Sequence, residues 1–188
     1  MTNSTGTPAT KRSERPSDEA DKKQLELAKR EGAQYLAALD YMTTQVAETG
    51  AKTEAGDYIV AFAQEGAEGM YHLIDGALAW VEAPPGTNCH IEIAVLDACD
   101  HRFIPYLTID CTLSQGGNEI VKFRPEFLWH PGLFHYGKDV QVPGDSVFDL
   151  HVSIAAPTFP RHDKLNGRRY ASHVDVVFKA VTIKTGRG

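Results

Sequence analysis

The sequence places a histidine and a glutamate, His90 and Glu92, at the spacing of paired metal ligands. They lie in the run CHIEIAVL, where the residues alternate as in a β-strand. Residues two apart on a strand point the same way, and their side chains lie within about 7 Å of each other, a span that one metal ion can bridge. The alternation predicts that this pair faces away from the main core.

Two more histidines occur where the local pattern exposes an imidazole. His135 lies in WHPGLFHYG, after a Pro-Gly turn, and His173 begins the segment HVD with Asp175 on the same face. Three imidazoles and one carboxylate suit copper(II) or zinc. Three hypotheses follow: a metal-binding protein, a metalloenzyme that uses an open coordination position, or a binding sandwich with a degenerate site.

The elements that would position these residues are predicted to be strands. After Gly56 the apolar residues recur with period two, and the turn pairs Asp75-Gly76 and Gly116-Gly117 indicate tight hairpins. No helical period occurs after Gly50. We therefore predict a mainly β chain with an immunoglobulin-like antiparallel β-sandwich over residues 51–188; a closed barrel is the alternative.

The first 50 residues have a different pattern. Residues 1–16 are polar and predict a disordered tail, whereas residues 17–50, which begin with the potential cap Ser17, predict one long amphipathic helix. The apolar stripe of that helix consists of Leu25, Leu36, Leu39 and Val46. We expect the stripe to pack on the sandwich or on a second subunit, and a homodimer is the expected assembly.

Composition excludes several classes of partner. The formal net charge is -6 and no basic run is interleaved with aromatic residues, which argues against nucleic acid or an anionic membrane as a partner. No apolar run approaches the length of a membrane span or follows the basic start as in a signal peptide, so the sequence predicts a cytoplasmic protein. The three cysteines, Cys89, Cys99 and Cys111, fit reduced thiols that are mostly buried.

Four short motifs occur in a specific order, HIE, PYLTI, HYG and HVD. In order and spacing they resemble the bacterial periplasmic ferrous-iron-transport accessory family, small copper-binding β-sandwich proteins that act beside iron permeases. The resemblance spans residues 88–178, and the ordered set is more specific than any one motif. It implies metal binding related to iron transport and favours binding over catalysis.

The resemblance also implies a ligand set. The ligands of the family fall on His90, Glu92, His135 and His173, and its methionine ligand falls on Leu128, which cannot bind a metal. Either His130 replaces that ligand or the site has one ligand fewer. Because a thioether favours copper(I), its loss shifts the expected preference toward copper(II), zinc or iron(II).

Overall fold

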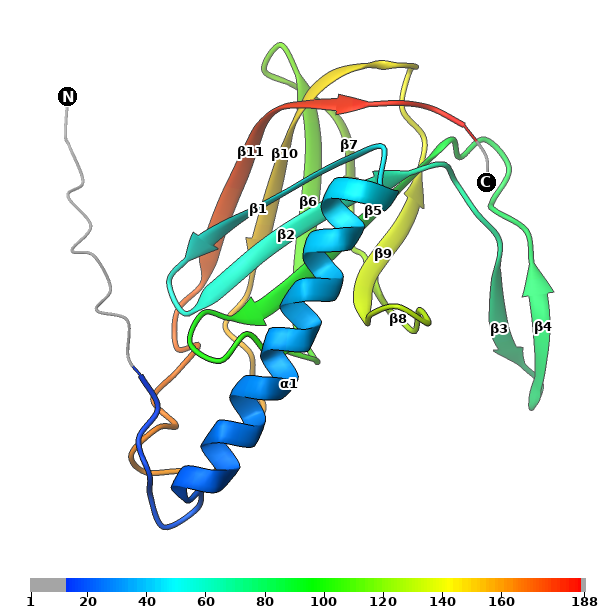
Figure 1. Ribbon diagram of the computed structural model, residues 1–188. Coiled ribbons are helices and arrows are strands. Elements are labelled where there is room, and N and C mark those ends of the chain that lie inside the picture. Colours follow the sequence, from blue (N-terminus) through cyan, green and yellow to red (C-terminus); the bar gives the residue numbers. More distant parts are fainter. Residues whose placement is uncertain (1–12, 187–188) are drawn as a thin grey trace, which may run out of the picture.

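Two antiparallel sheets form the body of the protein in the computed structural model, which describes residues 13–186 (Figure 1). The first sheet has the strand order β1-β2-β5-β9-β8. Its strands are β1 (Thr49–Ala55), β2 (Tyr58–Glu65), β5 (Cys89–Asp97), β8 (Glu126–Leu128) and β9 (His135–Val140). The second sheet has the order β11-β10-β6-β7. Its strands are β6 (Ile109–Gln115), β7 (Asn118–Phe123), β10 (Ser146–Ile154) and β11 (Val174–Ile183).

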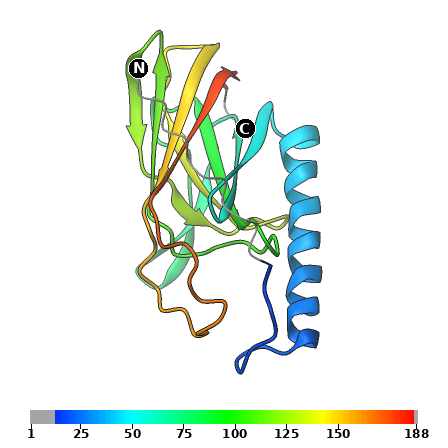
Figure 2. The ribbon, with the colours of Figure 1, turned by 90° about the vertical axis from the view of Figure 1, so that its left-hand side faces the viewer.

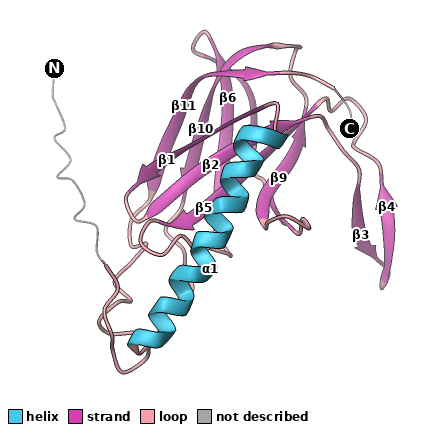
Figure 3. Ribbon diagram, in the orientation of Figure 1, coloured by secondary structure: helices cyan, strands magenta, loops and turns pink. Residues whose placement is uncertain are grey.

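The alternation in the sequence explains why the two sheets pack on each other. Val60 and Ile93 of the first sheet belong to the same buried cluster as Leu113 and Val152 of the second. Cys89 and Cys111 are also buried there as free thiols, and burial raises the pKa of Cys89 to about 12. The prediction of a mainly β antiparallel sandwich with an N-terminal helix is confirmed, as the colouring of Figure 3 shows.

The helix α1 (Lys22–Tyr41) begins later than the sequence predicted. Its N-cap is Asp21, whose carboxylate accepts from the Gln24 amide while the Gln24 side chain accepts from the Asp21 amide. Ser17 instead accepts from the amides of Glu19 and Ala20 and donates to Asp163. The reciprocal cap at Asp21 satisfies two amides, so the helix starts there.

The helix lies against the outer face of the first sheet (Figure 2). Leu39 is buried in a second cluster with Ile59 and Leu96, and Leu36 packs against it, as predicted. Val46 does not follow the prediction and is 53% exposed. The last turn, η1 (Met42–Val46), is π-helical, and this wider turn moves Val46 out of the stripe.

The segment before the helix departs from the predicted tail. Residues 1–12 lie outside the described residues, but Glu14 pairs with Arg169 at 2.9 Å, and the Arg15 amide donates to Asn166 at 3.0 Å. These contacts tie residues 14 and 15 to the loop between β10 and β11. The helix also ends before Gly50, because β1 begins at Thr49.

A two-stranded hairpin projects from the sandwich (Figure 1). It consists of β3 (Met70–Ile74) and β4 (Ala77–Val81), which are joined at Asp75-Gly76 as predicted, with both turn residues at positive φ. One face carries four exposed apolar side chains, Tyr71, Leu73, Leu78 and Trp80. The opposite face, with Met70 and His72, is the one that borders the sandwich.

Candidate metal centre

Strand register brings the candidate ligands together on the first sheet. On the antiparallel pair β5 and β9, His90 lies opposite Asp139 and Glu92 lies opposite Gly137. His135 is two residues before Gly137, so it shares that face. The period of two in HIE and in HYGKD therefore builds one face from two strands that are distant in the sequence.

His90, Glu92 and His135 converge closely enough to hold one ion. Each offers a ligand atom, and these atoms all lie within 4.8 Å of one another. His135 Nε2 is 3.3 Å from Glu92 Oε1. Within residues 13–186 this is the group of His, Cys, Asp or Glu side chains that has the geometry of a metal site. Imidazole and carboxylate side chains are ligands that transition-metal ions bind.

The face that carries these residues is buried, which the sequence did not predict. His90, Glu92 and His135 are only 0%, 4% and 3% exposed. The alternation correctly separated them from the main core, but helix α1 packs over the same face of the sheet. Tyr35 of the helix donates a hydrogen bond to the Phe134 carbonyl just before β9, and so joins the helix to the segment that precedes His135.

Several nitrogens in this buried group have no hydrogen-bond partner among the described residues. They are His90 Nε2 and both ring nitrogens of His135. The other nitrogen of His90, Nδ1, is 2.8 Å from Asp139 Oδ1. A carboxylate on one imidazole nitrogen orients the ring and presents the other nitrogen as a metal ligand. Unpartnered buried nitrogens are costly, and one metal ion would satisfy His90 Nε2 together with one ring nitrogen of His135. The residues therefore fit a bound metal.

Burial also sets the protonation of the ligands. It lowers the pKa of His135 to about 4, with repulsion from His90 and His130 adding to the effect. The imidazole of His135 is therefore neutral near pH 7, the form that binds metals. Burial opposes the charged form of His90 as well, but the Asp139 hydrogen bond and the Glu92 charge outweigh it, so its pKa is raised.

The pKa of Glu92 is raised, as that of His90 is. Burial, with a smaller contribution from the nearby carboxylates of Glu65 and Glu68, raises it to about 7 against the lowering effect of His90. A carboxyl group with this pKa exchanges its proton near neutral pH. A cation in the centre would favour the carboxylate.

Leu128, which the resemblance aligns with a methionine ligand, lies beside the centre. It pairs with His135 across β8 and β9. A Cβ atom at Gly137 would lie 2.6 Å from both Leu128 Cδ1 and His90 Nε2, so these two atoms are near neighbours. Any side chain at position 137 would therefore collide with His90 Nε2, and glycine avoids this collision.

His130 is adjacent to the group but is exposed. Its ring centroid is 5.9 Å from that of His135, and its Nδ1 accepts from the Gly132 amide at 3.0 Å, which leaves Nε2 for another partner. His173, in contrast, does not join the group within this chain. Its Nε2 is 3.0 Å from Asp175 and 3.1 Å from Ser153, on the second sheet.

Sequence reasoning missed three residues around the centre. Asp139 could have been found, because it continues the alternation of HYGKD from His135 and Gly137. Glu65 lies opposite His90 on β2, and one of its oxygens is buried without a partner. Tyr35 approaches from the helix, and burial followed by the charge of Glu92 raises its pKa. No local pattern indicates Glu65 or Tyr35, because each depends on tertiary packing.

The two sheets and the buried group define an antiparallel β-sandwich with a candidate metal centre. The structure matches FetP of uropathogenic Escherichia coli strain F11 with a TM-score of 0.57 and 18% identity, over 74% of this chain and 99% of that chain. It also matches copper-reconstituted P19 of Campylobacter jejuni with a TM-score of 0.54 and 18% identity, over 71% of this chain and 95% of that chain. The resemblance drawn from the motifs is confirmed at the level of the fold.

A copper-bound variant of FetP matches as well, with a TM-score of 0.55 and 16% identity, over 72% of this chain and 95% of that chain. Sequence comparison adds nothing to these likenesses, since neither a family model nor a curated protein matches.

The comparison contradicts the predicted cytoplasmic location. FetP was expressed in the periplasm for its structure determination, so the structural neighbours point to the periplasm. The cytoplasmic prediction rested on the first residues of the sequence, which do not determine a compartment. In residues 13–186, no helix combines the length and apolar character required to cross a membrane.

Proposed function

We propose that this protein binds copper through His90, Glu92 and His135. One observation carries the proposal: two buried imidazoles with unpartnered nitrogens and one buried carboxylate offer ligand atoms within 4.8 Å of one another. Copper is favoured because structural neighbours are copper-bound proteins. The metal would accept one nitrogen from each imidazole and would supply the positive charge that pairs with the carboxylate. Asp139 would orient His90, and the helix would exclude water.

We include His130 as the fourth ligand in this proposal. Its free Nε2 and its distance from His135 support that role. Imidazole and carboxylate ligands without a thioether suit copper(II) better than copper(I). His173, which the resemblance suggested, stays outside the proposed set, since Ser153 and Asp175 hold it on the other sheet.

Copper(II) titration of matched variants tests the ligand set. We expect wild-type protein to bind one equivalent with nitrogen hyperfine structure in its electron paramagnetic resonance spectrum. His135→Ala should lose at least tenfold in affinity, because second-sphere changes alone cost roughly ten- to a hundredfold at such sites. His173→Ala is the matched control and should bind as the wild type does. Equal affinities of wild type and His135→Ala would refute the site, and a selective loss in His173→Ala would refute the ligand set.

We further propose that the protein forms a homodimer through its hairpin. The helix stripe, on which the sequence argument for a dimer rested, packs mainly on its own sandwich. The hairpin instead exposes Tyr71, Leu73, Leu78 and Trp80, and Leu73 and Leu78 are 73% and 70% exposed. An isolated two-stranded hairpin is marginally stable, so a covering surface would stabilise it. Sedimentation of wild type and Leu78→Asp tests this: a wild-type monomer at micromolar concentration would rule out the dimer.

We propose a role beside an iron permease as the physiological context, because the ordered motifs resemble that accessory family. Uptake of radioactive iron by the source cells under iron limitation tests this role. We expect uptake to fall when the gene is deleted and to recover with the wild-type gene but not with His135→Ala. Unchanged uptake in the deletion strain would remove the transport role without affecting copper binding.

A further inference from the structure

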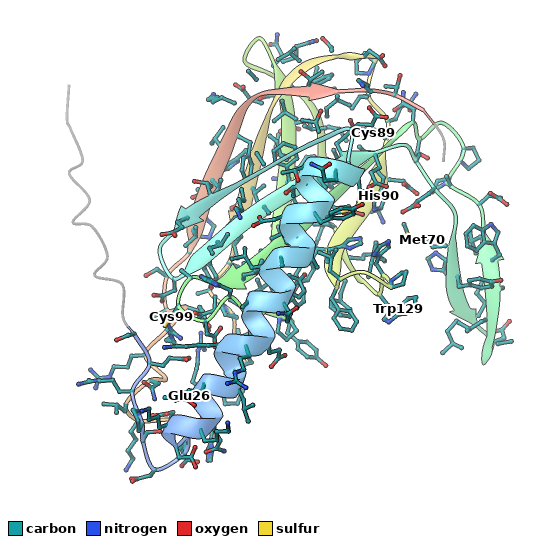
Figure 4. The ribbon with its side chains drawn as sticks, viewed as in Figure 1. Glu26, Met70, Cys89, His90, Cys99 and Trp129 are labelled. Atoms are coloured by element: carbon teal, nitrogen blue, oxygen red, sulfur yellow. The ribbon has the colours of Figure 1, made fainter. Side chains whose placement is uncertain are left out.

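A pocket of about 120 Å³ lies between the projecting hairpin and the sandwich, next to the metal centre. The hairpin contributes Met70 and His72, and the sandwich contributes Leu128, Gly137 and Asp139. Met70 lies at the base of the hairpin on the side of the sandwich, as the label in Figure 4 shows. The pocket therefore brings a thioether and an imidazole together beside a centre that lacks a sulfur ligand.

Met70 and His72 can reach a common ion. They are two residues apart on β3, so their side chains leave the same face of the hairpin, with Cα atoms roughly 7 Å apart. The long, flexible methionine side chain can close this gap toward the imidazole. A thioether selects soft ions such as copper(I), and an imidazole also binds copper. None of the residues proposed as ligands of the inner centre is needed for this pair.

The lining of the pocket is acidic. It carries four carboxylates, of Glu68, Glu82, Glu126 and Asp139, and one ammonium group, of Lys138. Glu126 and Lys138 pair with each other at 2.7 Å, and Asp139 is bonded to His90, which leaves the carboxylates of Glu68 and Glu82 in excess. A concave surface with excess negative charge raises the local concentration of cations. The charge thus favours a metal ion over an anionic or neutral ligand.

The pocket adjoins the inner centre at two residues. Asp139 lines the pocket and also bonds to His90 Nδ1. Gly137 lines the pocket as well, and a side chain there would meet His90 Nε2. An ion in the pocket would therefore lie close to His90, with no side chain at position 137 between them.

We propose that Met70 and His72 form a second, outer metal site that takes copper(I). The inner site has nitrogen and oxygen ligands and the outer site has a sulfur ligand, so the two sites differ in the oxidation state that they favour. The choice of copper rests on the proposed function, but the outer site is defined by its own residues. Carboxylates of the pocket supply the compensating negative charge.

Methionine methyl resonances provide a direct test with silver(I), a soft ion with the charge of copper(I) and no redox chemistry under these conditions. The chain has three methionines, and buried Met42 serves as an internal reference. All proteins in this test carry Cys99→Ser, because the partly exposed Cys99 thiol would bind silver(I) before a thioether does. In chloride-free buffer we expect the ¹³C-methyl resonance of Met70 to shift and to saturate near one equivalent, with Met42 unchanged. Met70→Leu should remove the shifting resonance and assign it.

Two variants separate this site from the inner one. In His72→Ala we expect the Met70 shift to need at least tenfold more silver(I), since the imidazole partner is gone. In His135→Ala, which disables the inner site, the shift should persist at the wild-type concentration. An unshifted Met70 resonance, or a shift that His72→Ala leaves unchanged, would overturn the outer site. Copper(II) binding that depends on His135 would stand in either case.

Discussion

Replacing Glu92 with glutamine should stabilise the metal-free protein in mildly alkaline solution. The folded chain holds the pKa of Glu92 at about 7, from an ordinary value of 4.5. Between these values the folded state binds a proton that the unfolded state has lost, so stability falls as pH rises and the loss is complete above pH 7. Each pKa unit corresponds to about 1.4 kcal/mol, which gives about 3 kcal/mol for the whole shift.

The expected difference between variants is smaller than this total. Glutamine keeps the shape of the side chain but carries no charge, so it removes the free-energy cost of burying the ionised carboxylate of Glu92. It also removes the attraction that helps to raise the pKa of His90. We therefore expect Glu92→Gln to gain about 2 kcal/mol over wild type at pH 8 and much less at pH 5. His135 contributes in the opposite sense, with stability lost as pH falls from 6.5 toward about 4, in both proteins.

Urea denaturation with a chelator present at the two pH values measures this effect. Equal slopes of free energy against urea in both proteins would show that the comparison is valid. Glu119→Gln, an exposed change on β7, is the control and should leave the pH dependence unaltered. If Glu92→Gln has the same stability relative to wild type at pH 5 and pH 8, the charge of Glu92 is not the cause and the reasoning fails. Saturating copper(II) should reverse the order, because the carboxylate is a proposed ligand.

Three further substitutions test the centre and the helix. Leu128→Met should raise the affinity for copper(I) relative to copper(II), since the new thioether would lie beside His90. Competition with a copper(I) chelator measures this affinity. If it does not rise, the alignment of Leu128 with the methionine ligand of the family is wrong. Asp139→Asn should weaken copper(II) binding roughly ten- to a hundredfold in a titration by removing the carboxylate behind His90, and unchanged binding would contradict that role. Gly32→Ala should lower the free energy of unfolding by about 1–3 kcal/mol, because the added Cβ would overlap the Asp100 carbonyl oxygen. Thermal unfolding measures this loss. A variant as stable as the wild type would show that α1 moves to accommodate the Cβ without cost.

The fold was more predictable from the sequence than the environment of the site. Period-two alternation and the two hairpin turns depend on neighbouring residues, and both predictions hold in the structure. The shared face of His90 and Glu92 follows from the same local rule. Their burial does not, because it depends on where the helix packs.

The placement of His173 shows the same limit. The sequence pattern predicted that His173 lies at the start of the last strand, but it could not predict the order of the strands in the sheets. Strand β11 pairs with β10 in the second sheet, so His173 bonds to Ser153 and Asp175 there, away from His90 on the first sheet. Short motifs carry no information on which strands become neighbours. Tyr35 was missed for the same reason.

The pairing of β5 with β9 restricts how the centre can change. His90 and Asp139, like Glu92 and Gly137, are directly opposed across these strands. Inserting or deleting one residue between His135 and Gly137 would turn every following side chain of β9 to the other face, and Gly137 and Asp139 would leave the centre together. The connection before His135 lies outside the ladder, so its length can vary without this inversion. Insertions and deletions in this protein should therefore be excluded from β9. In residues 129–134 they would avoid this inversion, but they would displace His130, the proposed fourth ligand, and the Phe134 carbonyl that bonds to Tyr35.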